Sequence, residues 1–293
     1  MIASGPSRTV WHDCRFLTCS VLPVGRACNL RCPFCFSKSS LSALRRERPD
    51  WSRLDIDRYY TFARERGAAR LVITGGGEPL LRPDDVCFLI DRGAAHFDEI
   101  ACFTNGTYLT PDLARRLADS GLSYLCYSRH HHDEARCREL MGRGTPTLDE
   151  FFATVRDLPV RATCVMARGY VDSRNTVQEY INRLRAYGVR EFTFKHTYTA
   201  YEGSVFGSSP ENHWSREHQV EFDPFEGQGR VVFRLPWGPV VRHIGGLQVC
   251  YYHEPTPAWE QEHRLCRSSN LMSDGTVYAS LEDRSSRLFR LTR

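Results

Sequence analysis

The sequence predicts an α/β fold in which parallel strands form an open, partial barrel. Between residues 15 and 195, short apolar runs alternate with amphipathic stretches, and this βαβα rhythm is typical of a parallel sheet with right-handed crossovers. Six strands are expected, whereas a closed barrel of this kind has eight. The chain has 293 residues, of which 41% are hydrophobic and 25% charged, which suits one large globular domain with an extension. We therefore expect a partial (β/α)6 TIM-like barrel.

The expected strands are short runs rich in β-branched and aromatic residues. They cover residues 15–21, 70–74, 99–104, 124–128, 160–166 and 191–195. The expected helices lie between them and cover residues 56–66, 84–96, 111–120, 147–155 and 176–187. Because sites in such sheets lie at the carboxyl ends of the strands, the residues that follow each strand are the first place to look for function.

The rhythm stops after Lys195, and the remaining region is rich in aromatic residues, Pro and Gly. We divide the chain into a barrel core at 1–196 and a C-terminal extension at 197–293, which is expected to cover the open mouth of the barrel. One hairpin signal remains in the extension, at 271–278, where Asp274 and Gly275 form the turn.

Composition excludes several classes of protein. No run of 18 apolar residues and no N-terminal signal segment occur, so a membrane protein and a secreted protein are not expected. The net charge of +4, without a basic stripe, does not indicate a nucleic-acid partner. The twelve cysteines are irregularly spaced, which favours a metal site in a reducing cytoplasm over a disulfide framework.

The strongest local signal is a loop with three cysteines, Cys28, Cys32 and Cys35, directly after the first expected strand. Three thiolates in one short loop can each bind one iron of a [4Fe–4S] cluster and leave the fourth iron open for a small molecule. A zinc site would need a fourth Cys or His nearby, and the loop has none.

This Cys-x3-Cys-x2-Cys loop, with Phe34 before its last Cys, resembles the signature of the radical S-adenosylmethionine (SAM) superfamily. A second motif, Gly76-Gly77-Glu78-Pro79, lies where that superfamily has its Gly-Gly-Glu-Pro motif. The resemblance implies two cofactors, one [4Fe–4S] cluster and SAM, which chelates the open iron. One electron, from an external reductant such as flavodoxin or ferredoxin, then cleaves SAM and releases a 5′-deoxyadenosyl radical.

The resemblance also implies which residues contact SAM. Gly76 and Gly77 would let backbone carbonyls approach the methionyl ammonium, and Glu78 would support the strand end. Polar residues at later strand ends would bond SAM or the substrate, and apolar ones would pack on adenine. The candidates at these later strand ends are Thr104, Asn105, Ser128, Val165 and Met166.

A run of three histidines, His130, His131 and His132, follows the fourth expected strand. Three adjacent side chains on a regular strand or helix cannot all face one ion. We expect contacts to SAM or substrate, or a solvated loop, in preference to a metal site.

The C-terminal region resembles tails that bind an auxiliary cluster in some radical SAM branches, but it departs from their pattern. Where three cysteines would be expected, this chain has His263, Cys266 and Ser280. One thiolate does not indicate a second cluster, so a redox-neutral reaction, or one with an external reductant, is expected. That directs attention to Cys250, which could return a hydrogen atom to a substrate radical from the opposite face and so invert a carbon centre. A buried structural role for Cys250 is the alternative.

In size, layout and Cys250 the chain resembles the radical SAM epimerases of aminoglycoside biosynthesis, the neomycin C epimerase type. That resemblance implies an isomerase of antibiotic biosynthesis with a cationic sugar as substrate, bound by acidic residues. The candidates in the extension are Glu202, Asp223, Glu254, Glu282 and Asp283. A peptide-modifying radical SAM enzyme (an epimerase or a crosslinking enzyme) and a radical SAM sugar-alcohol dehydrogenase remain alternatives. A non-enzymatic iron–sulfur sensor would not need Gly76-Gly77-Glu78-Pro79.

Overall fold

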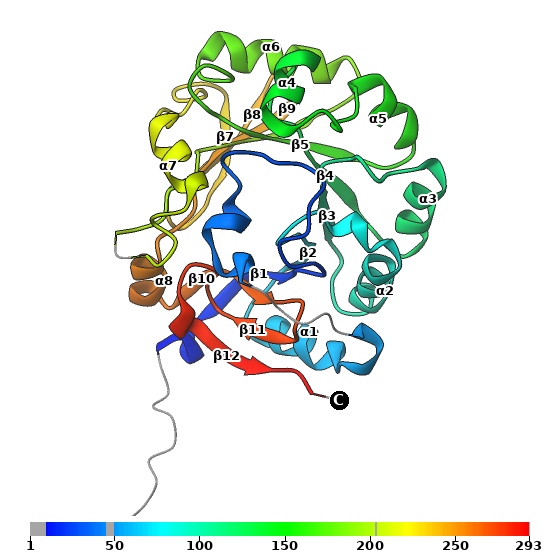
Figure 1. The fold of residues 1–293 in the computed structure, drawn as a ribbon, viewed down its shortest axis with the longest axis vertical. Helices are drawn as coiled ribbons and strands as arrows, with labels where there is room; N and C mark the ends of the chain where they lie inside the picture. The colour runs from blue at the N-terminus through cyan, green and yellow to red at the C-terminus, as the bar shows by residue number, and fades with distance from the viewer. Residues whose placement is uncertain (1–9, 45–49, 203, 293) are drawn as a thin grey trace, which may run out of the picture.

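A computed structural model describes residues 10–44, 50–202 and 204–292, which form a ring of strands with helices around it (Figure 1). All six expected strands are present, and neighbours in the chain pair in parallel. They are β1 (Arg15–Val21), β2 (Arg70–Ile73), β3 (Ile100–Thr104), β4 (Tyr124–Ser128), β5 (Val160–Val165) and β6 (Glu191–Lys195). The expected α/β partial barrel is confirmed.

The C-terminal region extends this sheet at both edges. Strand β9 (Leu247–Tyr252) pairs in parallel with β6, and β10 (Leu265–Leu271) pairs in parallel with β1. Over the described residues the barrel therefore has eight parallel strands, and it stays open between β9 and β10, which no strand pairing joins. Helix α8 (Pro257–His263) connects these two strands. The sequence did not predict these two strands, because polar residues that face the lumen, such as Gln248 and Arg267, interrupt their apolar pattern.

Four antiparallel strands complete the sheet. Strands β8 (Val240–Ile244) and β7 (Arg230–Arg234) lie beyond β9, and β11 (Thr276–Tyr278) and β12 (Arg287–Arg290) lie beyond β10. The predicted turn at Asp274 and Gly275 joins β10 to β11, and Gly275 has the positive φ of +80° that such a turn requires. We expected one hairpin in this region, but it contributes more strands than that, namely β7 to β12.

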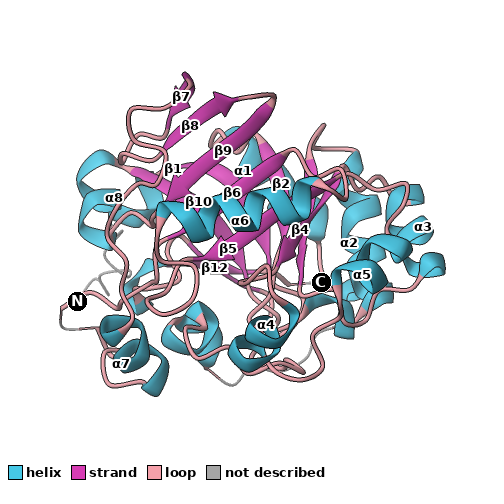
Figure 2. Ribbon diagram, turned by 90° about the horizontal axis from the view of Figure 1, so that it is seen from above, coloured by secondary structure: helices cyan, strands magenta, loops and turns pink. Residues whose placement is uncertain are grey.

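Most helices pack on the outer face of the sheet, whereas Glu134–Met141 and Pro210–Glu217 lie at the carboxyl ends of its strands (Figures 1 and 2). Besides α8 the helices are α1 (Ile56–Glu65), α2 (Pro83–Ala94), α3 (Pro111–Asp119), α4 (Glu134–Met141), α5 (Leu148–Thr154), α6 (Arg174–Arg185) and α7 (Pro210–Glu217). Short 3-10 helices cover Val10–Asp13, Phe36–Ser39, Leu41–Ala43, Trp51–Arg53, Pro79–Leu81 and Arg284–Ser286. The five expected helices are present within two residues at each end, because Ser, Thr or Asp caps and Pro at the first turn mark their starts. Helix α4 was not expected.

Residues 196–202 and 204–218, including α7, lie against the cysteine loop at the carboxyl ends of the strands. The Trp214 ring packs on Phe34 at 5.7 Å between ring centroids, and Ser209 bonds Ser39 at 2.7 Å. Helices α7 and α4 lie on the same side of the sheet (Figure 2). These contacts join the first part of the C-terminal region to the cysteine loop, while β9 and β10 of the same region belong to the barrel itself. No described helix is long and apolar enough to cross a membrane.

Candidate active site

The cysteine loop follows β1 and lies inside the ring of strands (Figure 1). Cys28 is exposed, and Cys32 and Cys35 are partly buried. Burial raises the pKa of Cys32, and the nearby Cys35 and Cys28 raise it further, so the three thiols lie close enough to interact. Among the described residues, no three His, Cys, Asp or Glu side chains are placed around a single metal ion. Three thiols of one short loop can each bind one iron of a [4Fe–4S] cluster.

The glycine run after β2 packs directly on the backbone of this loop. A Cβ added at Gly77 would lie 1.7 Å from the carbonyl oxygen of Ala27, and one at Gly76 would lie 2.4 Å from that of Gly25. The Glu78 N–H donates to the Ala27 carbonyl at 3.0 Å. Because these glycines have no side chain, the backbone after β2 can contact the backbone of the cysteine loop directly.

Glu78 joins the ends of β2 and β3. Its carboxylate is buried and accepts from the Thr104 hydroxyl at 2.7 Å, the Asn105 N–H at 2.8 Å and the Leu80 N–H at 3.1 Å. Burial raises the pKa of Glu78, and these three donors oppose the rise. The expected supporting role of Glu78 agrees with this arrangement.

Asn105 connects the end of β3 to the cysteine loop. Its side-chain amide donates to the Asn29 side chain at 3.0 Å and points to Cys28 Sγ at 3.9 Å, and its oxygen accepts from the Thr107 N–H at 3.0 Å. The Thr104 hydroxyl likewise forms two hydrogen bonds within the protein: it donates to Glu78 and accepts from the Gly106 N–H. Both side chains were expected to bond SAM or substrate, and here their hydrogen bonds hold the loop instead.

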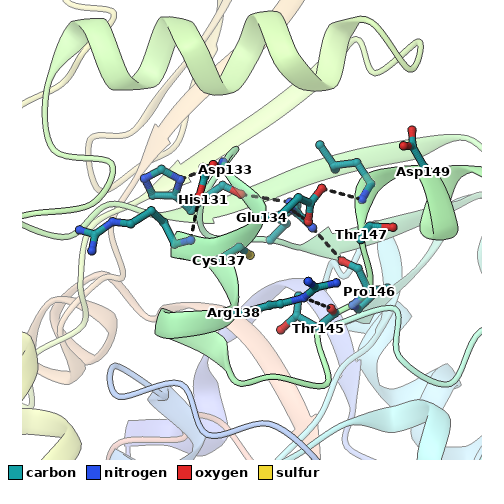
Figure 3. A network of polar contacts seen from close by, with 12 residues as sticks. His131, Asp133, Glu134, Cys137, Arg138, Thr145, Pro146, Thr147 and Asp149 are labelled. Carbon is teal, nitrogen blue, oxygen red and sulfur yellow. Dashed lines mark hydrogen bonds and ion pairs between the residues drawn. The ribbon is translucent and has the colours of Figure 1, made fainter.

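Helix α4 supports the loop from the other side, and the sequence did not indicate it. Leu30 and Cys32 pack with Cys137 and Met141 of this helix, and the Arg31 N–H donates to the Met141 carbonyl at 2.9 Å. Figure 3 shows the polar contacts that position the helix, among them His131 with Asp133 at its start and Arg138 with the Thr145 carbonyl. The only sequence signal for α4 was Asp133, a good N-cap.

The histidine run is part of this framework. His130 Nδ1 accepts from the Val165 N–H at 3.0 Å, and burial lowers the pKa of His130 to about 3, so the ring is neutral. Arg129 is completely buried and donates to the carbonyls of His131 and Pro146 and to Glu134 at 2.7 Å. The His130 ring also lies edge-on to Phe34, at 4.7 Å between centroids. His130 and His131 are buried, so the expected solvated loop is wrong for these two residues.

The remaining predicted SAM contacts divide in two. Met166 is fully buried in the apolar core between sheet and helices, so the expected packing on adenine is wrong for this side chain. The strand alternates its faces, and the partly exposed Val165 is therefore the residue that faces the lumen. Ser128 is partly buried at the end of β4, beside Thr163 of β5.

Cys250 lies in β9 and faces the lumen of the barrel. Its neighbours Val249 and Tyr251 pack in the apolar core outside the sheet, so strand alternation points Cys250 inward with Tyr252. Burial raises the pKa of Cys250 to about 12, so the sulfur carries its proton at neutral pH. Lys195, on the neighbouring β6, faces the same space.

The Lys195 ammonium lies 5.3 Å from the ring centres of both Phe103 and Tyr252. Burial lowers its pKa, and Glu254 opposes that change. No carboxylate of the described residues lies within ion-pair distance of this ammonium. The sequence did not indicate Lys195 as a site residue, because one Lys at a strand end forms no recognisable motif.

The structure separates the five acidic candidates. Glu202 is exposed, Asp223 pairs with Arg242 at 3.0 Å, and Asp283 caps the 3-10 helix Arg284–Ser286. Glu254 and Glu282 come together at the opening between β9 and β10, where Glu260 of α8 joins them. Sequence reasoning did not select Glu260.

The residues considered for an auxiliary cluster are His263, Cys266 and Ser280. Cys266 is buried in β10, and the pKa of each thiol is shifted chiefly by a hydrogen bond between Cys266 and Cys14. His263 is exposed, and its ring stacks on Trp259.

Comparison with known proteins agrees with this geometry. A sequence profile described as Radical SAM superfamily matches residues 22–162. The chain is 31% identical over 154 residues to GTP 3′,8-cyclase of Listeria monocytogenes, covering 51% of this chain and 45% of that protein. It is 38% identical over 96 residues to the mycofactocin maturase MftC of Mycobacterium tuberculosis, covering 31% of this chain and 22% of that protein. The chain thus spans half the length of these relatives or less.

Among solved structures, Streptococcus suis SuiB bound to S-adenosylmethionine superposes with a TM-score of 0.60 at 16% identity, over 94% of this chain and 64% of SuiB. This likeness shows a shared fold. Radical SAM proteins use a [4Fe–4S] cluster and SAM, which are the cofactors that the cysteine loop fits. The profile match thus covers just under half of the chain, residues 22–162, and these residues include the cysteine loop with Cys28, Cys32 and Cys35.

Proposed function

We propose that this chain is a radical SAM enzyme, and that it is an epimerase that inverts one carbon centre of a cationic, aminoglycoside-type sugar. One observation carries the proposal: a protonated thiol, Cys250, faces the barrel lumen from β9, the strand that borders the opening between β9 and β10. A hydrogen-atom donor must hold its hydrogen, and burial keeps this thiol un-ionised at neutral pH.

When bound, the [4Fe–4S] cluster and SAM supply the radical that removes a hydrogen atom from a substrate carbon. The chain supplies positions and a second hydrogen. Cys28, Cys32 and Cys35 would hold the cluster, while Asn105, Glu78 and α4 keep their loop in place. Residues 196–202 and 204–218 would cover the mouth and exclude water that would quench reactive species.

Cys250 then acts from the other side of the lumen. Its S–H bond breaks and a C–H bond forms on the opposite face of the substrate carbon, which leaves a sulfur-centred radical. One electron from an external one-electron reductant, of the flavodoxin or ferredoxin class, and one proton from solvent restore the thiol. The reaction is neutral in redox for the sugar, as inversion requires.

The test uses anaerobic, reconstituted protein with SAM, dithionite and neomycin C in deuterated water. The wild type is expected to invert one centre and to incorporate one solvent deuterium there. Cys250→Ala is expected to cleave SAM and to lose at least about a thousandfold in inversion, since removing a group that acts in the chemical step costs that much or more. Cys126→Ala is the matched control, since Cys126 is another buried thiol near Lys195. Inversion at the normal rate by Cys250→Ala would contradict the proposal.

A further inference from the structure

Strand β7 is exposed along its whole length at one end of the sheet. It pairs with β8 on one side, and within the described residues its outer edge has no strand partner. In Figure 2 it lies at the margin of the molecule. All five of its residues are exposed, among them Val231 at 41%, Val232 at 42% and Phe233 at 49%. Such an edge offers unpaired backbone N–H and C=O groups next to apolar side chains.

The opposite end of the sheet shows that this exposure is not general to its edges. Strand β12 likewise has Arg at both ends and apolar residues between them. Its Leu288 and Phe289 are partly buried and pack against the apolar core, and the Phe289 ring lies edge-on to Phe62 at 4.8 Å between centroids. Residues 231–233 of β7 belong to no apolar cluster of the described part of the chain. Apolar residues that are exposed together in this way mark a contact surface more often than single ones do.

The two ends of β7 carry positive charges that the protein leaves unpaired. Arg230 and Arg234 are exposed, and among the described residues neither guanidinium forms an ion pair or a hydrogen bond. On β8, His243 lies opposite Arg230 and Val240 lies opposite Arg234, so the neighbouring strand offers no carboxylate there. A strand that pairs with the outer edge and has a carboxylate near each end would supply the missing charges.

The same charges disfavour a second copy of this chain as the occupant. Two edges related by a twofold axis pair in antiparallel, and the register that pairs all five residues sets Arg230 opposite Arg234 of the other copy twice. Like charges directly opposite each other destabilise a strand pair. The pairing with β8 also shifts between Val231 and Phe233, so Val232 is a bulge residue. Charges and bulges of this kind prevent an edge from pairing with its own copies, whereas the arginines attract a strand with acidic ends.

We propose that the free edge of β7 binds an extended segment of a partner protein, with acidic residues at the ends of the segment and apolar residues between them. The backbone of the segment would pair with β7. Its apolar side chains would cover the three exposed apolar residues, and its carboxylates would lie opposite the two arginines. In strand addition of this type the backbone supplies affinity and the side chains supply specificity. The inference goes beyond the proposed reaction and does not depend on it, because β8 separates β7 from the strand of Cys250.

The first experiment measures binding of a fluorescein-labelled peptide to the reconstituted protein by fluorescence anisotropy. The probe is the capped peptide Glu-Thr-Val-Tyr-Val-Thr-Glu, and its matched control has Lys in place of both Glu residues. The acidic peptide is expected to bind at least about tenfold more tightly than the basic one, because two opposite-charge pairs become like-charge pairs in the control. No saturable binding of the acidic peptide below about 1 mM would overturn the proposal.

Charge reversal on the protein locates the site. The double variant Arg230→Glu, Arg234→Glu is expected to lose about tenfold or more in affinity for the acidic peptide and to gain affinity for the basic one. The matched control is the double variant Arg58→Glu, Arg287→Glu, which makes the same change in net charge at exposed residues of α1 and β12. It should bind both peptides as the wild type does. An equal loss in the two double variants would indicate attraction by net charge alone and contradict a site on β7.

A third measurement distinguishes strand pairing from loose electrostatic contact. Two further acidic peptides carry N-methyl groups on the odd or on the even residues, which removes the N–H donors from one edge or the other and keeps every side chain. One of them should lose about tenfold or more in affinity, and the other should bind as the parent peptide does, because only one edge of an added strand faces β7. Equal affinity of all three peptides would rule out pairing with the backbone of β7.

Sedimentation velocity tests a second copy as the occupant. The wild type and the variant Arg230→Glu, Arg234→Glu are expected to sediment alike, and their Tm values should agree because both residues are exposed. Self-association of the wild type that this variant changes would assign the edge to a second copy and overturn the proposal.

Discussion

The side-chain amide of Asn105 lies 3.9 Å from Cys28 Sγ and joins the end of β3 to the loop that would hold the cluster. The same amide donates to Asn29, so a single side chain sets the position of the first cysteine and of its neighbour. Hydrogen bonds to cluster sulfurs influence both the loop geometry and the reduction potential.

Replacing Asn105 by Ala should lower the midpoint potential of the reconstituted cluster. A donor near sulfur favours the reduced, more negative state, and one such contact contributes about 0.5–1 kcal/mol, or about 20–40 mV for one electron. A redox titration followed by electron paramagnetic resonance measures the shift. Asn182→Ala, which removes an exposed amide on α6, is the control. An unchanged potential would mean that the contact has no electronic effect.

Replacing Gly77 by Ala should prevent the cysteine loop from adopting its position, because the new methyl would lie 1.7 Å from the Ala27 carbonyl oxygen. Overpacking of this kind costs about 1–3 kcal/mol or more. Iron per chain after anaerobic reconstitution is expected to fall to less than about half of the wild-type value. Gly25→Ala, in the same loop, has its nearest contact at 3.9 Å and should keep full iron content. Equal iron content in both variants would refute the packing argument.

The buried Arg129 should be the most sensitive position outside the cysteine loop. Its guanidinium satisfies two carbonyls and Glu134, and a Lys in its place cannot serve all three. Arg129→Lys should lose about 2–4 kcal/mol of unfolding free energy in urea. Arg115→Ala, a surface ion pair on α3, should change it by less than about 1 kcal/mol. If both variants unfold at the same urea concentration, the network does not stabilise the fold.

Stability should decrease as the pH rises past neutrality. The pKa of Glu282 in the folded protein is about 8, above the ordinary carboxyl value, so the folded state holds this proton more tightly than the unfolded chain. That contribution is fully present below the unfolded pKa and is lost as the pH rises through about 8. Thermal unfolding between pH 6 and 9 should show a falling Tm in the wild type and a flatter curve in Glu282→Gln. A steeper curve in the variant would contradict this sign.

Local features of the sequence predicted the first six strands and the cofactor. The residues of each strand, and those of the cysteine loop, are close together in the chain, so their spacing alone is enough to identify them. The prediction that Met166 contacts adenine failed, because successive residues of a strand point to opposite faces of the sheet. A shift of one residue therefore moves a side chain from the lumen to the core. Sequence reasoning also failed for helix α4, whose few apolar positions contact the cysteine loop in place of a regular apolar stripe.

By itself, the sequence determined the α/β class, the three cysteines and the glycine motif, because each depends on residues that are close neighbours in the chain. Only the tertiary structure decided that β9 and β10 extend the barrel to eight parallel strands and that Cys250 faces its lumen. It alone brought Glu254, Glu260 and Glu282 around one cavity. The physical reason is that charge balance and burial depend on which side chains the fold brings together. The spacing of these three glutamates along the chain does not show that they become neighbours.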